Sequence, residues 1–429
     1  MRRTMGLGSA LAVLAVVGTV AVGCGGSSKS SSSSSGGTPA SGTKGGSINV
    51  AIVDNPQMKD IAKLTPSLFT AKTGIKVKYT ILDEGTLRQV TTRDVAAGGR
   101  QFDVAMIGAF EAPQFGRNGT LVDLTPQAKA DAAYQYNDII PAVRNALSAD
   151  GKLYAAPFYA ESSFLMYRKD VLKKAGITMP LHPTWDQVAA AARKVNSPNM
   201  AGICLRGKPG WGDLGAAFTT VLNTFGGTWW SAKPDGSIDK AQVDQPAFKQ
   251  ALQFYVNLVK DAGEKDAANA SFNECLSQYK DSKVAMWYDA TVAAGLLEAS
   301  DSPVKGKNGY AFAPTVKTPA SGWLWSWALA IPKTTSKQDL AWKYISFATG
   351  PQYLKEAGSK IDGGWAALPP GTRKSTYEIP QYKKAAAAFA DTTLKAMAAA
   401  PINNPGTTKR PGVPGVQYVG VPQFQDVGN

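Results

Sequence analysis

The stretch that decides the fold is Ser47-Ile48-Asn49-Val50-Ala51-Ile52-Val53, a largely apolar run that predicts a strand. Residues 57–73 follow as a predicted helix, and the alternating run of residues 76–82 predicts a second strand. Residues 84–97 predict another helix, and residues 102–107 predict a buried third strand. Because strands and helices alternate, we expect an α/β fold with a parallel sheet covered by helices on both faces.

Ligands of such sheets bind beyond the carboxyl ends of the strands. In this chain that rule points to Asp54 and Asn55 after the first strand. It also points to the segment from Gly108 to Glu111 after the third strand. Polar side chains at both places are therefore candidates for a binding site.

A second set of strands and helices follows. Strands are predicted near residues 163–167, 285–287, 309–313 and 323–331, and helices over residues 184–195, 213–225, 246–262 and 336–349. No long linker separates two self-contained halves, so we expect two lobes joined by several crossings of the chain. The length of 429 residues agrees with two lobes.

The formal net charge of +14 raises the question of a nucleic-acid partner. Lys and Arg are scattered along the chain, however, and form no basic helix or stripe. The charge therefore predicts a solvated surface suited to an anionic cell envelope, and no nucleic-acid partner.

Residues that carry catalysis are scarce. The chain has one histidine, His182, which we interpret as a loop or surface residue, and no G-x-S-x-G motif accompanies it, so a Ser-His-Asp triad is not expected. His and Cys residues are too few for a zinc site. Residues 202–209 resemble a phosphate-binding loop, but Pro209 replaces the Ser or Thr that would hold magnesium. We therefore predict a protein that is not an enzyme and has no metal or cofactor.

The N-terminus predicts export. Residues 1–23 combine an Arg pair, an apolar stretch and small residues, the order of a secretory signal. Cys24 stands where a lipoprotein signal places the cysteine that is diacylated. Residues 24–45 are rich in Ser and Gly and predict a flexible tether. We expect a protein anchored to the outer face of the cell membrane by lipidated Cys24.

Removal of the signal leaves Cys204 and Cys275 besides Cys24. Export makes a disulfide chemically available, but the spacing of the two residues does not show whether they pair. A disulfide and two buried free thiols both remain open.

Several aromatic and charged residues have the chemistry of sugar or polyol recognition. Aromatic faces stack on C–H patches, and charged groups form strong hydrogen bonds to hydroxyls. Trp211 lies in a Gly- and Pro-rich loop, while Trp323, Trp325 and Trp327 alternate and should share one face of a strand. The candidates for polar contacts include Glu161, which is alone in an uncharged stretch, Asp289 at the end of an apolar strand, and Arg373.

At these residues the chain resembles the extracellular solute-binding proteins of ABC importers, family 1, and more closely their sorbitol/mannitol-binding branch. The resemblance runs from about Gly46 to the end of the chain. The segments that carry it are residues 102–113, 153–162, 167–170, 202–212, 286–291 and 418–426. The Glu161 strand and the Arg-Gly-Lys-Pro-Gly-Trp-Gly loop at residues 206–212 are the most specific of these when taken together.

The resemblance implies a periplasmic-binding-protein-like, type II fold, a two-lobed Venus flytrap in which each lobe has a mixed, mostly parallel sheet flanked by helices. Lobe 1 would comprise residues 46–156 and 309–349, and lobe 2 residues 157–308 and 350–429. The three crossings would lie near Ala156–Pro157, Gly306–Gly309 and Gly350. Relatives usually continue with a further C-terminal helix, so a chain that stops at Asn429 would be truncated.

The resemblance also implies a function. A monomer would capture a polyol, such as sorbitol, mannitol or arabitol, or a sugar in the interlobe cleft and hand it to the permease subunits of an ABC transporter. The predicted ligand-binding residues are Asn55, Glu111, Tyr159, Glu161, Lys208, Trp211, Asp289, Trp323, Trp325 and Arg373. A secreted glycoside hydrolase or an envelope glycan-binding protein is the alternative, since Glu161 with Glu111 or Asp289 could form a pair of catalytic carboxylates.

Overall fold

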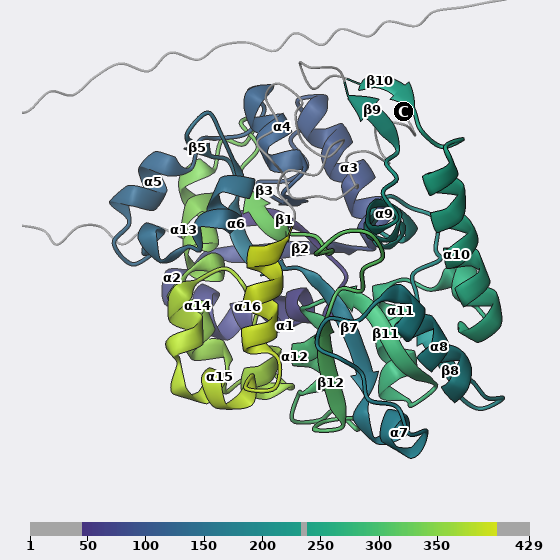
Figure 1. The fold of residues 1–429 in the computed structure, drawn as a ribbon. Helices are drawn as coiled ribbons and strands as arrows, with labels where there is room; N and C mark the ends of the chain where they lie inside the picture. Colours follow the sequence, from purple (N-terminus) through teal and green to yellow (C-terminus); the bar gives the residue numbers. More distant parts are fainter. Residues whose placement is uncertain (1–44, 233–237, 401–429) are drawn as a thin grey trace, which may run out of the picture. The chain divides into compact units, whose positions relative to one another are not determined.

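Five strands form the first of two main sheets. The computed structural model describes residues 45–232 and 238–400 (Figure 1). Their order across the sheet is β2 (Lys76–Leu82), β1 (Ser47–Val53), β3 (Val104–Gly108), β13 (Trp325–Ala330) and β6 (Ala156–Glu161). Strands β1, β2 and β3 are parallel, and β13 runs antiparallel to both of its neighbours. The predicted strand–helix alternation is confirmed, with β1 and β2 beginning and ending where the sequence pattern places them.

Four strands form the second main sheet. Their order is β12 (Asn308–Phe312), β7 (Ser163–Arg168), β11 (Val284–Ala290) and β8 (Ala201–Cys204). Strand β7 is antiparallel to β11 and β12, while β11 and β8 are parallel. Two small pairs complete the strands: β4 (Ser148–Ala149) with β5 (Lys152–Leu153), and β9 (Trp230–Ala232) with β10 (Ile238–Ala241).

Helices pack on both sheets. Those in contact with the first sheet are α3 (Glu84–Ala96), α4 (Glu111–Arg117), α6 (Pro141–Ala146) and α13 (Gln338–Thr349). Those in contact with the second are α7 (Lys169–Lys174), α8 (Trp185–Val195), α10 (Pro246–Ala262), α11 (Phe272–Lys280) and α16 (Ala390–Ala399), and α9 (Leu214–Thr224) packs on α10. The remaining helices are α1 (Pro56–Thr65), α2 (Ala71–Thr73), α5 (Thr125–Ala130), α12 (Ala293–Leu297), α14 (Pro351–Ala357) and α15 (Pro380–Ala385).

Local sequence explains where several of these helices begin. The side chain of Asn55 accepts a hydrogen bond from the Met58 N–H and caps α1, with Pro56 in the first turn. Asp83 caps α3 in the same way, and Thr184 with Gln187 forms a capping box at α8. Asn55 lies two residues after β1 and Asp83 directly after β2, so the caps place polar side chains at the carboxyl ends of the strands.

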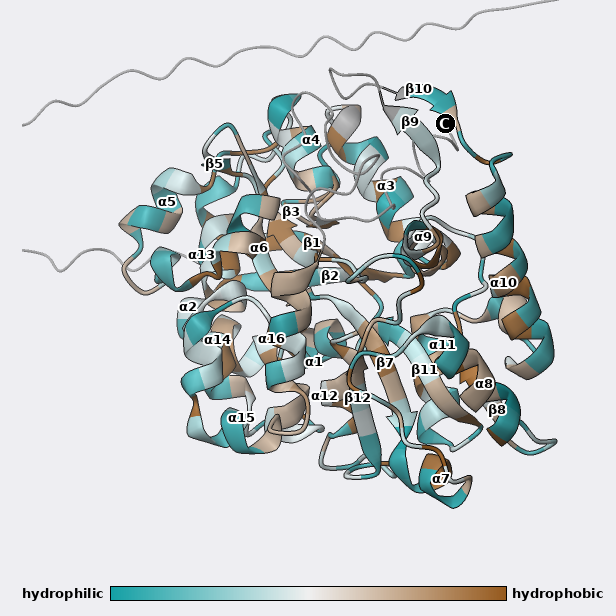
Figure 2. Ribbon diagram, viewed as in Figure 1, coloured by the Kyte–Doolittle hydropathy of each residue, from teal (hydrophilic) through white to brown (hydrophobic). Residues whose placement is uncertain are grey.

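Two hydrophobic clusters form the core. The strands are mostly apolar, whereas the outer faces of helices such as α10 are hydrophilic (Figure 2). One cluster is built on the first sheet and the C-terminal helices, and the other on α8, α9 and α10 with part of the second sheet. No helix among residues 45–232 and 238–400 is long and apolar enough to cross a bilayer.

We use lobe 1 and lobe 2 for the parts of the chain built on the first and second sheets. The crossings differ in place from those that the resemblance implies. Strand β6 belongs to the first sheet, so the first crossing lies at Ser162 and not at Ala156–Pro157. Strand β12 belongs to the second sheet, so the next crossing follows Phe312. After Gly350 the chain packs first on α13 and then, through α16, on β7 and β12.

Candidate ligand-binding site

A cavity of about 230 Å³ lies between the two lobes. Lobe 1 contributes the residues that follow β1 and β2, side chains of β6 and β13, and Trp323 just before β13. Besides Trp323 these include Asp54, Asn55, Asp83, Glu84, Tyr159, Glu161, Trp325 and Trp327. Lobe 2 contributes residues that follow β8 and begin α9 and α11, among them Arg206, Lys208, Asp213, Ser271 and Asn273. We call these the first wall and the second wall of the cavity. The cavity is smaller than the roughly 300–1,000 Å³ typical of drug-sized ligands, so it suits a small solute.

The first wall is aromatic because of the register between β6 and β13. Trp325 lies opposite Glu161, and Trp327 lies opposite Tyr159. Residues two apart in a strand, and residues paired across strands, share a face of the sheet, so these four side chains all face the cavity. Gly108 on the neighbouring strand permits this packing, because a Cβ there would lie 1.9 Å from the Trp325 ring.

Glu161 has a buried carboxyl group with an oxygen atom available to a ligand. It is 6% exposed, and its Oε2 atom has no hydrogen-bond partner in the described part of the chain. Burial raises its pKa well above the ordinary value; Arg206 opposes this shift, and Asp289 and Glu84 add to it. A ligand hydroxyl could therefore satisfy a buried oxygen whose desolvation is otherwise uncompensated.

Asn55 and Tyr159 form a second polar pair on the first wall. The Asn55 Nδ2 atom donates to the Tyr159 hydroxyl at 2.9 Å, and Asn55 Oδ1 accepts from the backbone of α1. The Tyr159 hydroxyl thus accepts one hydrogen bond and keeps its own proton for a further acceptor. Its orientation is fixed before a ligand arrives.

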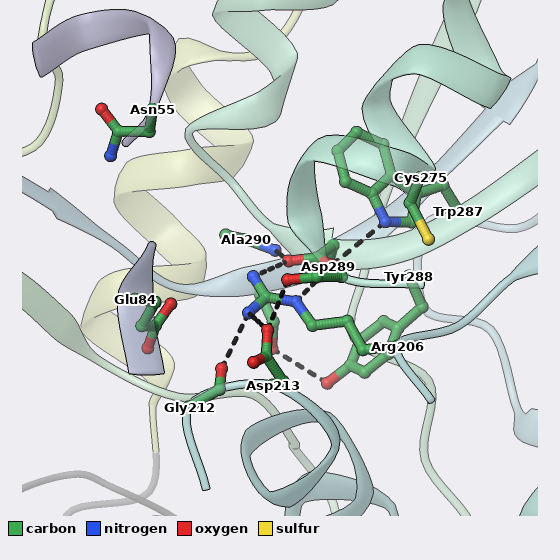
Figure 3. A network of polar contacts seen from close by, with 12 residues as sticks. Asn55, Glu84, Arg206, Gly212, Asp213, Cys275, Trp287, Tyr288, Asp289 and Ala290 are labelled. Atoms are coloured by element: carbon green, nitrogen blue, oxygen red, sulfur yellow. Dashed lines mark hydrogen bonds and ion pairs between the residues drawn. The ribbon is translucent and has the colours of Figure 1, made fainter. Parts of the chain in front are cut away.

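The second wall is organised around Arg206 (Figure 3). Its Nε and Nη2 atoms donate to the two carboxylate oxygens of Asp289 at 2.8 and 2.6 Å, and Nη1 donates to the Gly212 carbonyl at 2.8 Å. Burial opposes its charge, but Asp289 and then Glu84 and Asp213 outweigh burial, so the pKa of Arg206 rises above its ordinary value. A buried guanidinium with this many acceptors is a fixed positive charge.

Asp289 fixes the position of Arg206 through two hydrogen bonds. It is fully buried, and it also accepts hydrogen bonds from the Trp287 indole and from the Ala290 N–H.

Cys204 and Cys275 form a disulfide with a Cα–Cα distance of 5.7 Å, which ties the end of β8 to α11. The sequence left open a disulfide or two buried free thiols, and the structure shows the disulfide.

The structure brings most of the predicted site together. The predicted residues that line the cavity are Asn55, Tyr159, Glu161, Lys208, Trp323 and Trp325. Asp289 does not line the cavity but holds Arg206, which does. Glu111 and Trp211 do not line this cavity, and both contact Arg88. Glu111 forms an ion pair with Arg88, and the Trp211 ring stacks on it with its centroid 3.7 Å from the Arg88 Cζ atom.

Arg373 is placed away from the cavity, and its prediction as a ligand contact is not supported. Its side chain is buried, and Nε donates to the carbonyl of Thr349, the last residue of α13, at 2.8 Å. The guanidinium also lies 4.7 Å from the centroid of the Tyr134 ring. A cation at a helix C-terminus compensates the unpaired carbonyls and the helix dipole, which explains a structural role.

The sequence interpretation missed several lining residues. Asp83 and Glu84 follow β2 as Asp54 and Asn55 follow β1, so the rule on strand ends would have found them. Arg206 lies in the quoted glycine-rich loop, and Trp327 in the quoted alternating run. Ser271 and Asn273 carry no signal of this kind, because only the fold brings α11 to the cavity.

The chain matches the model of the bacterial extracellular solute-binding protein family over residues 49–355. It belongs to that family. The mannitol-binding protein of Pseudomonas aeruginosa is 38% identical over 89% of this chain and 86% of that protein. Members of this family bind solutes and are not enzymes, so the prediction that the chain is not an enzyme is confirmed and the hydrolase alternative is set aside.

Solved structures of solute-binding proteins share the fold. A crystal structure of an ABC transporter solute-binding protein from Agrobacterium vitis S4 with bound D-mannitol has a TM-score of 0.81 and 44% identity, covering 89% of this chain and 90% of that one. One from Agrobacterium radiobacter K84 in complex with ribitol has a TM-score of 0.71 and 26% identity, covering 82% and 85%. The predicted two-lobed solute-binding fold is confirmed.

Proposed function

We propose that this solute-binding protein captures a linear polyol such as mannitol in the interlobe cavity. The observation that carries the proposal is the 44% identity to a mannitol-bound relative along 89% of this chain. The P. aeruginosa relative, named for mannitol, points the same way at 38% identity. The chemistry of the two walls gives an independent reason.

A polyol hydroxyl donates one hydrogen bond and accepts up to two, so its receptor needs both acceptors and donors. The first wall supplies acceptors such as Glu161, and the second wall supplies the cations Arg206 and Lys208. The indole rings of Trp323, Trp325 and Trp327 supply apolar faces for the C–H groups between hydroxyls. This combination favours a neutral, hydroxyl-rich solute over an apolar or strongly anionic one.

The size and energetics of the cavity agree with a small solute. A micromolar dissociation constant corresponds to a binding free energy of about −8 kcal/mol. Several hydrogen bonds to charged groups, each contributing about 1.5–3 kcal/mol, reach that value together with ring contacts after the cost of ordering the ligand.

Titration calorimetry of the purified chain tests the proposal with D-mannitol, sorbitol, arabitol, glucose and maltose. We expect saturable binding of at least one of the three polyols and weaker binding of maltose. Tight binding of maltose without detectable binding of the polyols would contradict the proposal. A Glu378→Gln chain, altered at an exposed carboxyl outside the cavity, is the control for protein quality.

We further infer that the protein is a lipid-anchored component of an ABC importer and delivers its ligand to separate permease subunits. The support is the signal-like order of residues 1–23, the position of Cys24 and the Ser- and Gly-rich composition of residues 24–45. Residues 1–44 lie outside the described residues. The C-terminal segment that carries part of the resemblance, residues 418–426, also lies outside them.

Cys24→Ala should release the protein from the membrane fraction, because no acyl chain can be attached. Fractionation of cells that express the two chains measures this. A Ser27→Ala chain, altered beside the same site, should stay with the membranes. A Cys24→Ala chain that still sediments with membranes after a high-salt wash would contradict lipid anchoring.

A further inference from the structure

Arg88 of lobe 1 lines the cavity and is held in place by side chains of its own lobe. Its Nε and Nη2 atoms donate to Glu84 Oε1 at 3.1 and 2.8 Å, and Nη1 donates to Glu111. Glu111 in turn accepts from the Gly108 N–H at 2.9 Å. Arg88 is only 7% exposed, so its guanidinium is a fixed, largely desolvated plane at the surface that lobe 1 presents to lobe 2.

Trp211 of lobe 2 covers that plane. The Arg88 Cζ atom lies 3.7 Å from the centroid of the Trp211 ring, and it also lies 4.5 Å from Trp327 and 4.8 Å from Trp325. Trp211 meets Phe110 edge-on, with ring centroids 5.8 Å apart. An indole from lobe 2 thus completes an aromatic surround whose other members belong to lobe 1.

The loop that carries Trp211 fits closely against lobe 1. A Cβ on Gly212 would lie 1.9 Å from Glu84 Oε1, so any other residue there would displace the Glu84 carboxylate from its place beside Arg88. Nearby, the Asn273 Nδ2 atom of lobe 2 donates to the Asp54 carbonyl of lobe 1 at 3.1 Å. The lobes therefore touch through direct contacts that involve no ligand.

The same loop is connected to the ligand cavity through Arg206. Arg206 lines the cavity and donates to the Gly212 carbonyl, next to Trp211. Leu214 N–H donates to the Lys208 carbonyl and Gly215 N–H to the Gly210 carbonyl, so the loop is tied to the start of α9. Arg206 and the loop that carries Trp211 therefore belong to one hydrogen-bonded unit.

We propose that the Arg88–Trp211 stack is a latch between the lobes, which stabilises the closed arrangement and so sets how tightly the solute is held. Trp211 acts as a positioning residue, because it does not line the cavity and its stack on Arg88 involves no ligand. Desolvated cation–π contacts are the strong ones, and closure is favoured by contacts that only the closed state makes. An apparent dissociation constant rises as the fraction of binding-competent protein falls. The inference rests on the proposed function.

The test compares Trp211→Leu, Trp211→Phe and a control, Trp365→Leu, in the full chain. Trp365 is another partly exposed tryptophan, and it lies outside the cavity and the latch. Small-angle X-ray scattering measures the radius of gyration with and without D-mannitol, and calorimetry measures the dissociation constant. We expect Trp211→Leu to enlarge the radius without ligand and to weaken mannitol binding about tenfold. Trp211→Phe, which keeps a ring face, should fall between it and the wild type.

Two results would overturn the latch. One is a Trp211→Leu chain that matches Trp365→Leu in both measurements. The other is weaker binding by Trp211→Leu with an unchanged radius, since Trp211 would then contact the ligand directly. If the wild-type chain does not bind mannitol or the other polyols, the proposed function fails, while the radius of gyration without ligand still decides the latch.

Discussion

The two walls of the cavity differ in how their buried ionisable groups are paired. On the second wall, the charge of Arg206 is matched inside the protein by the fully buried Asp289, which binds it through two hydrogen bonds and also accepts from the Ala290 N–H. On the first wall, Glu161 is nearly as buried, but its Oε2 atom has no partner in the described residues. The difference indicates that the second wall is built for rigidity, whereas the first wall leaves an acceptor for the ligand.

The largest expected effect is on the second wall, from Asp289→Asn. This change keeps the shape of the side chain but leaves Arg206 as a buried charge without its ionised partner. Breaking a buried pair in this way costs about 3–5 kcal/mol, so the free energy of unfolding should fall by about that amount. Urea unfolding of the ligand-free chain measures the change.

The matched control is Asp261→Asn on the same lobe. Asp261 pairs with Arg193, and both side chains are about half exposed, 48% and 47%. An exposed pair of this kind contributes little, so the unfolding midpoint should hardly move. Equal effects of the two substitutions would show that Arg206 does not depend on Asp289, and the contrast between the walls would be lost.

The sequence predicted the first wall better than the second for a physical reason. The period of two in a strand puts Trp325 and Trp327 of β13 on one face, and strand ends point to Asn55. Trp323, which was expected on the same strand, lies just before it and still lines the cavity. Arg206 and Ser271 reach the cavity from the loop after β8 and the start of α11, which are adjacent only because the second sheet and a disulfide join them. Arg373 shows the converse, since a charged residue in a glycine-rich turn faces inward to α13.

Glu264, behind the second wall, shows what a buried charge does without a counter-ion. It is 5% exposed and lies close to the Cys204–Cys275 disulfide. Burial is the main cause that raises its pKa from 4.5 to about 7. The unfolded chain loses this proton near pH 4.5 and the folded chain near pH 7, so stability from this group is present at pH 4 and is lost as the pH rises to 7.

Glu264→Gln should therefore be neutral at pH 4 and stabilising at pH 8, where the penalty reaches about 3 kcal/mol from a shift of roughly two and a half pKa units. Thermal or urea unfolding at the two pH values measures the difference. Glu378→Gln, at an exposed carboxyl, should show no such pH dependence. A Glu264→Gln chain with the same stability as the wild type at pH 8 would mean that this carboxyl is solvated.

The smallest expected effect on stability, and the one that separates the walls most directly, is that of Glu161→Gln on the first wall. Burial raises the pKa of Glu161 well above its ordinary value, so the neutral amide resembles the form that the ligand-free fold prefers. Ligand-free stability should change little near neutral pH. Binding should weaken by about 1–2 kcal/mol, because an amide N–H₂ replaces one carboxyl oxygen that could meet a ligand hydroxyl. Calorimetry with D-mannitol beside urea unfolding gives both quantities from one preparation. A loss of stability as large as that of Asp289→Asn, with unchanged affinity, would mean that Glu161 stabilises the fold and does not bind the ligand. The two walls would then no longer differ in function.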